Sequence, residues 1–173
     1  MFNVNELLKA TNGRLIRGNK NCAVKGISID TRTIRKDEAF IALRGDSFDG
    51  YNFVGAAIKK GSSCIICAPG KAKSAKKAVA FIEVKDTLSA LGDIARFKRE
   101  KFCLPVIAVT GSNGKTTAKE MIAWVLSKKY KVLKNEGTKN NRIGLPMTLF
   151  NLDGSFDLAV LEVGTNHFGE VNY

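Results

Sequence analysis

The segment Thr110–Thr117 reads Thr-Gly-Ser-Asn-Gly-Lys-Thr-Thr and contains residue types that bind phosphate. Glycine and small residues let backbone N–H groups point into one concavity, where they can hold phosphate oxygens. Lys115 could reach the β- and γ-phosphates of a nucleotide, and the Thr116 hydroxyl could ligate Mg²⁺. Val109 stands where the common Gly-x-x-x-x-Gly-Lys-[Ser/Thr] pattern has its first glycine. We therefore predict a phosphate-binding loop that departs from the common pattern at one position.

A second candidate for chemistry is Glu162, near the end of the apolar run Phe156–Val163. A phosphate-loop enzyme needs an acidic side chain on a neighbouring strand to complete its metal site. Ligands of open α/β sheets bind at the carboxyl ends of the strands, where Glu162 is expected. Burying an unpaired carboxylate is costly, so either a metal ion or a structural salt bridge would have to compensate its charge.

The elements around the loop follow from the apolar pattern. The run Leu104–Thr110 predicts the buried parallel strand before the loop, and the amphipathic segment Lys115–Tyr130 predicts the helix after it. We expect Met121 and Trp124 to pack in the core rather than to ligate a group. With a further strand at Lys131–Leu133, the result is a parallel sheet that cannot cover both its faces unaided.

The residues before Lys85 predict a small α/β domain. Its expected elements are a helix at Asn5–Ala10, strands at Val24–Asp30 and Ala39–Leu43, a helix at Tyr51–Lys60, and strands at Ser63–Cys67 and Val79–Val84. Asp86 is the expected N-cap of a helix over Thr87–Lys101. The predicted fold class is therefore α/β, with residues 1–85 as a small N-terminal domain. We expect residues 86–173 to be the first part of a P-loop ATP-binding domain whose sheet is incomplete.

The composition is basic, with 28 Lys and Arg against 16 Asp and Glu, a formal net charge of +12. A basic surface attracts polyanions, so a nucleic-acid-binding P-loop protein is one alternative. The densest basic cluster, Lys71–Lys77, has no aromatic residue for base stacking, which argues against that alternative. The sequence shows neither the uninterrupted apolar run of a membrane span nor a signal peptide, and we expect a cytoplasmic protein.

Four cysteines fit a reducing compartment. Cys64 and Cys67 have the spacing of metal ligands, but on a strand side chains three positions apart point to opposite faces. We therefore expect buried, inert thiols.

These residues together resemble the Mur ligase family, whose members form amide bonds through an acyl-phosphate made from ATP. The loop TGSNGKTT matches the short P-loop of that family. Three further stretches carry the resemblance: Ser28–Arg32 with Glu38–Gly45 and Phe48–Gly50, Asn140–Pro146, and Glu162–Glu170. They resemble the UDP-binding N-terminal domain, the loop that approaches the substrate and the γ-phosphate, and an E-x-G-x-N-H-x-G-E signature. Phe168 departs from that signature, which usually has proline there.

The resemblance implies a set of site residues. It places the ATP phosphates on Gly111, Ser112, Asn113, Gly114, Lys115, Thr116 and Thr117, and Mg²⁺ on Thr116 and Glu162. It places the uridine diphosphate near Thr31, Asp46, Ser47 and Phe48, and the sugar-peptide or the γ-phosphate near Asn140, Asn141, Asn166 and His167. The implied catalytic residues are Lys115, Glu162 and His167, the only histidine in the sequence.

The resemblance also implies substrates and cofactors. The signature at Glu162–Glu170 belongs to the branch of the family that joins D-alanyl-D-alanine to UDP-N-acetylmuramoyl-tripeptide in peptidoglycan precursor synthesis, with ATP and Mg²⁺. We expect a monomer without a membrane span or a nucleic-acid partner. Family members continue well beyond the equivalent of Tyr173, so we expect this chain to be part of a longer enzyme and inactive alone. The alternatives are a Mur-type ligase for the third peptide residue or for polyglutamate, and a UDP-sugar-binding module without catalysis.

Overall fold

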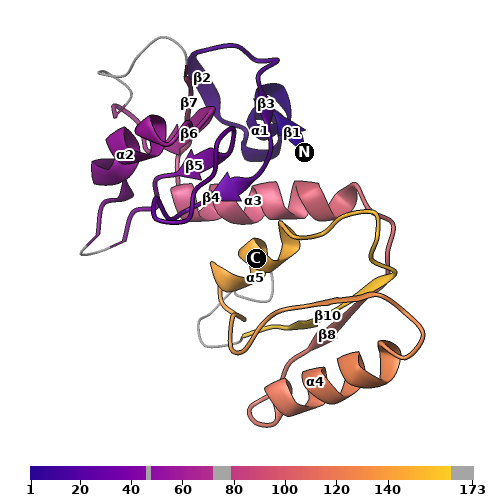
Figure 1. The fold of residues 1–173 in the computed structure, drawn as a ribbon. Helices are drawn as coiled ribbons and strands as arrows, with labels where there is room; N and C mark the ends of the chain where they lie inside the picture. The colour runs from indigo at the N-terminus through magenta and orange to yellow at the C-terminus, as the bar shows by residue number, and fades with distance from the viewer. Residues whose placement is uncertain (46–47, 72–78, 165–173) are drawn as a thin grey trace. The chain divides into compact units, whose positions relative to one another are not determined.

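A computed structural model of the chain describes residues 1–45, 48–71 and 79–164. The chain forms two compact units, Met1–Ile94 and Ala95–Tyr173, which divide within α3 (Thr87–Glu100). The α/β fold class predicted from the sequence is confirmed (Figure 1). The boundary at Lys85 stays a prediction, because a compact unit need not fold independently. Among the described residues, no helix has the length and apolar character needed to cross a bilayer.

The first unit is built on a five-stranded sheet. Its strands, in spatial order, are β2 (Arg14–Arg17), β7 (Ala80–Glu83), β6 (Cys64–Cys67), β5 (Ala39–Ile41) and β4 (Ile27–Ser28). The last four run parallel to one another, and β2 pairs antiparallel with β7. A separate antiparallel pair joins β1 (Phe2–Asn3) to β3 (Ala23–Val24).

Two helices begin where a polar side chain accepts from a free N–H group. In α1 (Val4–Thr11), the Asn3 side chain accepts from the Glu6 N–H while the Glu6 carboxylate accepts from the Asn3 N–H, a capping box. Asp86 accepts from the Ser89 N–H at the start of α3, as predicted. The turn η1 (Gly50–Phe53) leads into α2 (Val54–Lys59), which packs against alternate residues of the parallel strands.

The first unit differs from the predicted elements in several places, and the helix expected at Tyr51–Lys60 is divided into η1 and α2. The expected strand Val24–Asp30 is split between β3 and β4, because the chain leaves the ladder at Lys25, whose N–H donates to the Asp37 carbonyl. The strands β1 and β2 were not predicted: β1 has two residues, and β2 reads Arg-Leu-Ile-Arg, which lacks strict alternation of polar and apolar residues.

Cys64 and Cys67 lie on β6 as buried free thiols. Cys67 packs in the same cluster as α2, and the alternation of strand side chains directs Cys64 to the other face. Burial raises the pKa of Cys67 to about 11 and raises the pKa of Cys64 still further. Both thiols are therefore protonated at neutral pH and poorly reactive.

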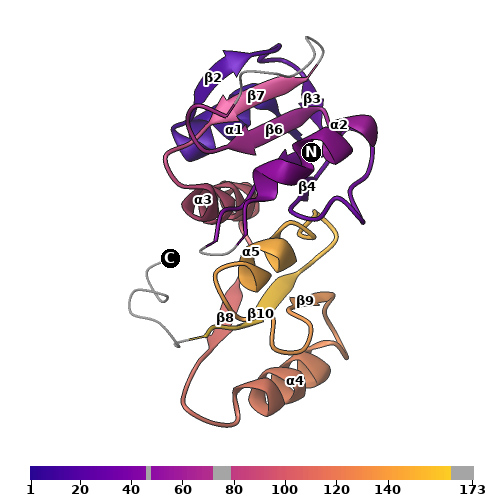
Figure 2. The same cartoon turned by 90° about the vertical axis from the view of Figure 1, so that its left-hand side faces the viewer.

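The second unit contains a three-stranded parallel sheet in which β10 (Leu158–Glu162) lies between β8 (Val106–Val109) and β9 (Val132–Lys134) (Figure 2). The three strands come from the three segments predicted to form this sheet. The chain passes from β8 through the predicted phosphate loop into α4 (Lys115–Leu126), which ends before the predicted Tyr130.

Alternation along β10 decides which side chains face which helix. Leu158 and Val160 pack with α4, whereas Ala159 and Leu161 pack with α5 (Gly144–Leu149). The two helices pack on opposite faces of the sheet (Figures 1 and 2). The prediction that β8 is buried is wrong, because this strand lies at the sheet edge and Ile107 is 37% exposed. The helix α5 was not predicted. By the same alternation Glu162 belongs to the α4 face, at the carboxyl end of β10.

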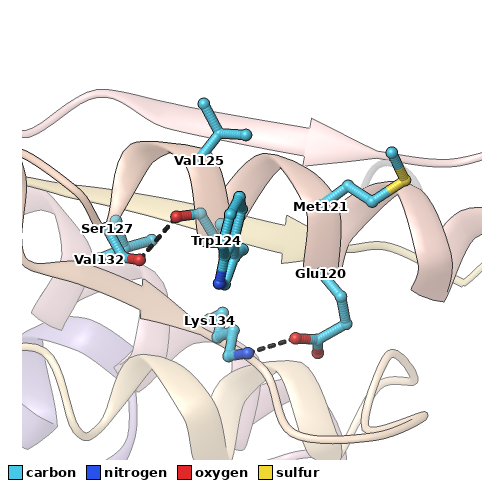
Figure 3. Close-up of a pocket in the computed structure, with 8 residues that line it drawn as sticks. Glu120, Met121, Trp124, Val125, Ser127, Val132 and Lys134 are labelled. Atoms are coloured by element: carbon cyan, nitrogen blue, oxygen red, sulfur yellow. Dashed lines mark hydrogen bonds and ion pairs between the residues drawn. The ribbon is translucent and has the colours of Figure 1, made fainter.

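The prediction that Met121 and Trp124 pack in the core is wrong. Each is 64% exposed, and Val125 beside them is 60% exposed. The residues of α4 that pack on the sheet are Ile122, Ala123 and Leu126. The exposed side chains project from α4 (Figure 3). Together with residues of β9 they line a hollow of about 600 Å³. The helix has two apolar stripes, and periodicity alone did not tell which one meets the sheet.

Candidate active site

The predicted phosphate loop turns the chain from β8 into the N-terminus of α4. Gly111 and Gly114 have φ values of +141° and +75°, a region that residues with a Cβ rarely adopt. Gly114 is the residue directly before α4. The loop therefore meets a helix end that carries free N–H groups and partial positive charge, an arrangement suited to phosphate.

The Lys115 side chain folds back over this loop. Its Nζ donates to the Gly111 carbonyl at 2.5 Å and to the Ser112 carbonyl at 3.4 Å. The ammonium group therefore stays at the loop, where it can exchange carbonyl oxygens for phosphate oxygens.

Glu162 is the buried acid of the site, with 2% of its surface exposed. The Thr116 hydroxyl donates to its Oε2 at 2.8 Å, and the Asn140 amide donates to its Oε1 at 2.7 Å. The structure thus brings together the first turn of α4, the end of β10 and the segment before α5. Both donors are neutral, so neither brings a positive charge that would compete with an incoming cation.

The donor set fits Mg²⁺. A hydroxyl and a carboxylate are hard oxygen ligands, and Mg–O distances of about 2.0–2.1 Å place neighbouring ligands of an octahedral ion about 2.9 Å apart. The Thr116 and Glu162 oxygens are 2.8 Å apart. In the described part of the chain, no three His, Cys, Asp or Glu side chains gather in one place. Two protein ligands completed by phosphate and water are what Mg²⁺ commonly takes.

The loop and the acid share one hollow of about 410 Å³. Its lining residues are Ser112, Asn113, Gly114, Lys115, Thr116, Thr117, Thr138, Asn140 and Glu162. Thr138 was not predicted, because a threonine in an irregular segment carries no pattern of its own.

Of the remaining predicted contacts of this site, only Asn141 lies among the residues that the structure describes. The Asn141 side chain accepts from the N–H groups of Ile143 and Gly144, at 3.1 and 2.8 Å, and so starts α5. Its predicted substrate contact stays a prediction. Asn166 and His167 lie outside the described residues.

A second hollow, of about 420 Å³, lies in the first unit and contains two of the predicted uridine-diphosphate contacts, Thr31 and Phe48. Its other lining residues are Ile29, Asp30, Arg32, Phe40 and Phe53. The Phe48 and Phe53 rings stack with their centroids 5.6 Å apart, so the hollow offers aromatic surface for a planar base. Phe53 was not predicted, and Asp46 and Ser47 lie outside the described residues.

An ion pair stands beside these aromatic rings. Arg32 Nη2 and Asp30 Oδ2 are 2.6 Å apart. Hydrogen bonds from the Arg32 side chain and backbone lower the pKa of Asp30 to about 2. A base-sized aromatic surface therefore lies next to an exposed guanidinium group, which suits a nucleotide with phosphates.

Residues 109–173 match the family model of the Mur ligase middle domain, and residues 23–99 match that of the Mur ligase family, catalytic domain. The two matches together span most of the chain, and the chain belongs to the Mur ligase family. The resemblance stated from the motifs is thereby confirmed.

Among individual relatives, the UDP-N-acetylmuramoyl-tripeptide--D-alanyl-D-alanine ligase of Haemophilus influenzae is 37% identical over 172 residues, which cover 97% of this chain and 37% of that protein. The crystal structure of MurF from Acinetobacter baumannii matches with a TM-score of 0.89 and 36% identity, over 99% of this chain and 38% of that one. The MurF ligase from Thermotoga maritima in complex with ADP matches with a TM-score of 0.76 and 29% identity, over 88% and 35%. The chain thus spans little more than a third of the length of these relatives.

Proposed function

We propose that the chain supplies the phosphate site and the uridine-nucleotide site of an ATP-dependent ligase. This enzyme would join D-alanyl-D-alanine to UDP-N-acetylmuramoyl-tripeptide in the cytoplasm, as a step of peptidoglycan precursor synthesis. The observation that carries the proposal is the meeting of Thr116, Glu162 and Asn140 beside the phosphate loop. The similarity to D-alanyl-D-alanine ligases over nearly the whole chain supports the choice of substrates.

The first proposed step is phosphoryl transfer. The terminal carboxylate of the tripeptide attacks the γ-phosphorus of ATP, the bond to the β–γ bridging oxygen breaks, and ADP leaves. Lys115 and the N–H groups of Gly111–Thr117 neutralise the charge that develops on the phosphate oxygens. Mg²⁺ held by Thr116 and Glu162 would supply further neutralisation.

The second proposed step is acyl transfer. The amine of D-alanyl-D-alanine attacks the acyl carbon, phosphate leaves with the bonding electrons, and loss of a proton from the nitrogen gives the amide. Asn140, Asn141, Asn166 and His167 are proposed to contact the sugar-peptide or the γ-phosphate. In the first unit, the uridine diphosphate is proposed to contact Thr31, Asp46, Ser47 and Phe48, with Phe53 extending the aromatic surface.

Replacement of the loop lysine tests this function. In the full-length enzyme, Lys115→Ala should lower kcat for ATP-driven ligation by about 10²-fold or more, because it removes a preorganised cation from the transferring phosphoryl group. Alanine is well tolerated at a helix start, so the circular-dichroism spectrum should be unchanged. The matched control is Lys129→Ala, an exposed lysine beyond the other end of α4, which should keep wild-type activity. The proposed role is wrong if Lys115→Ala retains more than about a tenth of the wild-type kcat.

A further inference from the structure

Two fully buried polar side chains lie just behind the proposed site without belonging to its ligand set. Lys119 is on α4 and Asn135 directly follows β9, and both are 0% exposed. A buried ammonium or amide group is costly unless each of its donors and acceptors has a partner. The partners of these two groups therefore show which parts of the fold they hold together.

The Asn135 side chain forms hydrogen bonds with both the N–H and the carbonyl of Glu162. Its Oδ1 accepts from the Glu162 N–H at 2.9 Å, and its Nδ2 donates to the Glu162 carbonyl at 3.0 Å. The same Nδ2 donates to the Lys139 carbonyl at 3.0 Å. The ladder between β9 and β10 ends at the pair Lys134–Val160. Beyond that pair, a side-chain amide takes over the pairing that backbone groups make along the strands.

Lys119 holds the segment that contains Asn135. Its Nζ donates to the carbonyls of Asn135 and Gly137, at 2.7 and 3.2 Å, and lies 3.1 Å from a carboxylate oxygen of Glu120. An ammonium group has three donors, and these three acceptors match them. Glu120 also pairs with Lys134 of β9, a second link between α4 and this region (Figure 3).

The hydrogen bonds of Asn135 also position Asn140, the second residue that donates to the Glu162 carboxylate. Asn135 fixes the Lys139 carbonyl, and the next residue is Asn140, whose amide donates to Glu162. The Asn140 carbonyl accepts from the Gly164 N–H at 2.8 Å. A Cβ at Gly164 would lie 2.9 Å from that carbonyl oxygen, so the two segments approach as closely as glycine permits.

We propose that Lys119 and Asn135 are positioning residues, which hold the backbone of Glu162 and the 135–140 segment in register with Thr116 on α4. This inference rests on the proposed function, in which Glu162 and Thr116 hold the metal ion. The direction of the Glu162 side chain follows from its backbone, and Asn135 fixes that backbone by two hydrogen bonds. Groups that orient metal ligands commonly change metal affinity by about 10- to 100-fold when they are removed.

The test compares Asn135→Ala and Lys119→Met with the wild type in the full-length enzyme. Two quantities are measured: the Mg²⁺ concentration for half-maximal ligation at saturating substrates, and hydrogen exchange of the Glu162 amide without metal or nucleotide. We expect the half-maximal Mg²⁺ concentration to rise about tenfold or more in both variants, with a smaller fall in kcat at saturating Mg²⁺. The Glu162 amide should exchange faster in Asn135→Ala, because its acceptor is gone.

The matched control is Leu152→Ala, which opens a cavity in the core of the same unit without touching the proposed site. It should lower the melting temperature and leave the half-maximal Mg²⁺ concentration unchanged. Lys119→Met keeps the side-chain volume, so it still provides the test if Asn135→Ala does not fold. The inference is overturned if the folded variants shift the Mg²⁺ dependence no more than Leu152→Ala does. An unchanged Mg²⁺ dependence in Glu162→Gln would instead overturn the metal assignment in the proposed function.

Discussion

At the scale of single residues, the second unit places one buried carboxylate among neutral donors. Thr116 and Asn140 donate to the two carboxylate oxygens of Glu162, and in the part of the chain that the structure describes no Lys or Arg forms an ion pair with this carboxylate. A Lys or Arg partner would have compensated that charge, as in a structural salt bridge, and would have left less attraction for a metal ion. The arrangement therefore favours the metal alternative over the salt-bridge alternative that the sequence left open.

The residue-scale prediction concerns Asp30 at the hollow of the first unit. The side-chain hydrogen bonds of Arg32 are the largest cause of the lowered Asp30 pKa of about 2, and the Arg32 backbone N–H contributes as well. Because folding lowers this pKa, the stabilisation of the folded state by the ionised Asp30 carboxylate is fully present above the ordinary pKa of 3.8. It is lost as the pH falls through about 2.

Arg32→Ala removes the side-chain hydrogen bonds and keeps the backbone one. The pKa of Asp30 should therefore rise to a value between about 2 and 3.8. An NMR titration of the Asp30 carboxyl carbon measures it. A pKa that stays near 2 in the variant would show that the guanidinium group is not the cause.

At the scale of elements, the sequence predicted the segments with strong patterns. The strands β8 and β10 were found as short continuous apolar runs, and the helix α4 was found from its helical period. The helix α5 has six residues and contains Pro146, so it offers neither the length nor the helix propensity that a pattern needs. Its start depends on the Asn141 side chain, which is local turn chemistry rather than periodicity.

The element-scale prediction follows from the outward face of α4. Trp124 is the only tryptophan in the sequence, and it is 64% exposed. The fluorescence of the 173-residue chain should therefore have the red-shifted emission of a solvent-exposed indole, and acrylamide should quench it efficiently. Blue-shifted emission with weak quenching would mean that this face of α4 is covered in solution.

At the scale of the whole molecule, the two units carry two different kinds of site. The first contains a hollow with stacked phenylalanine rings and Arg32, and the second contains the polar hollow at the phosphate loop. The sequence predicted the loop and Glu162 from their pattern, and the family resemblance supplied Thr31 and Phe48. Neither the pattern nor the resemblance predicted Lys119 and Asn135. The hydrogen bonds that tie them to the site, from Lys119 to Asn135 and from Asn135 to Glu162, span 16 and 27 residues and leave no local signature.

ATP is proposed to activate the tripeptide carboxylate before the amide forms, and an oxygen label tests this order directly. UDP-N-acetylmuramoyl-tripeptide labelled with ¹⁸O in its terminal carboxylate is incubated with ATP, D-alanyl-D-alanine and the full-length enzyme, and the released phosphate is examined by mass spectrometry. Since the attacking carboxylate oxygen stays on phosphorus when the amine displaces phosphate, each ligation should transfer one label to phosphate. Unlabelled phosphate accompanying amide formation would contradict the acyl-phosphate route and the function proposed for this chain.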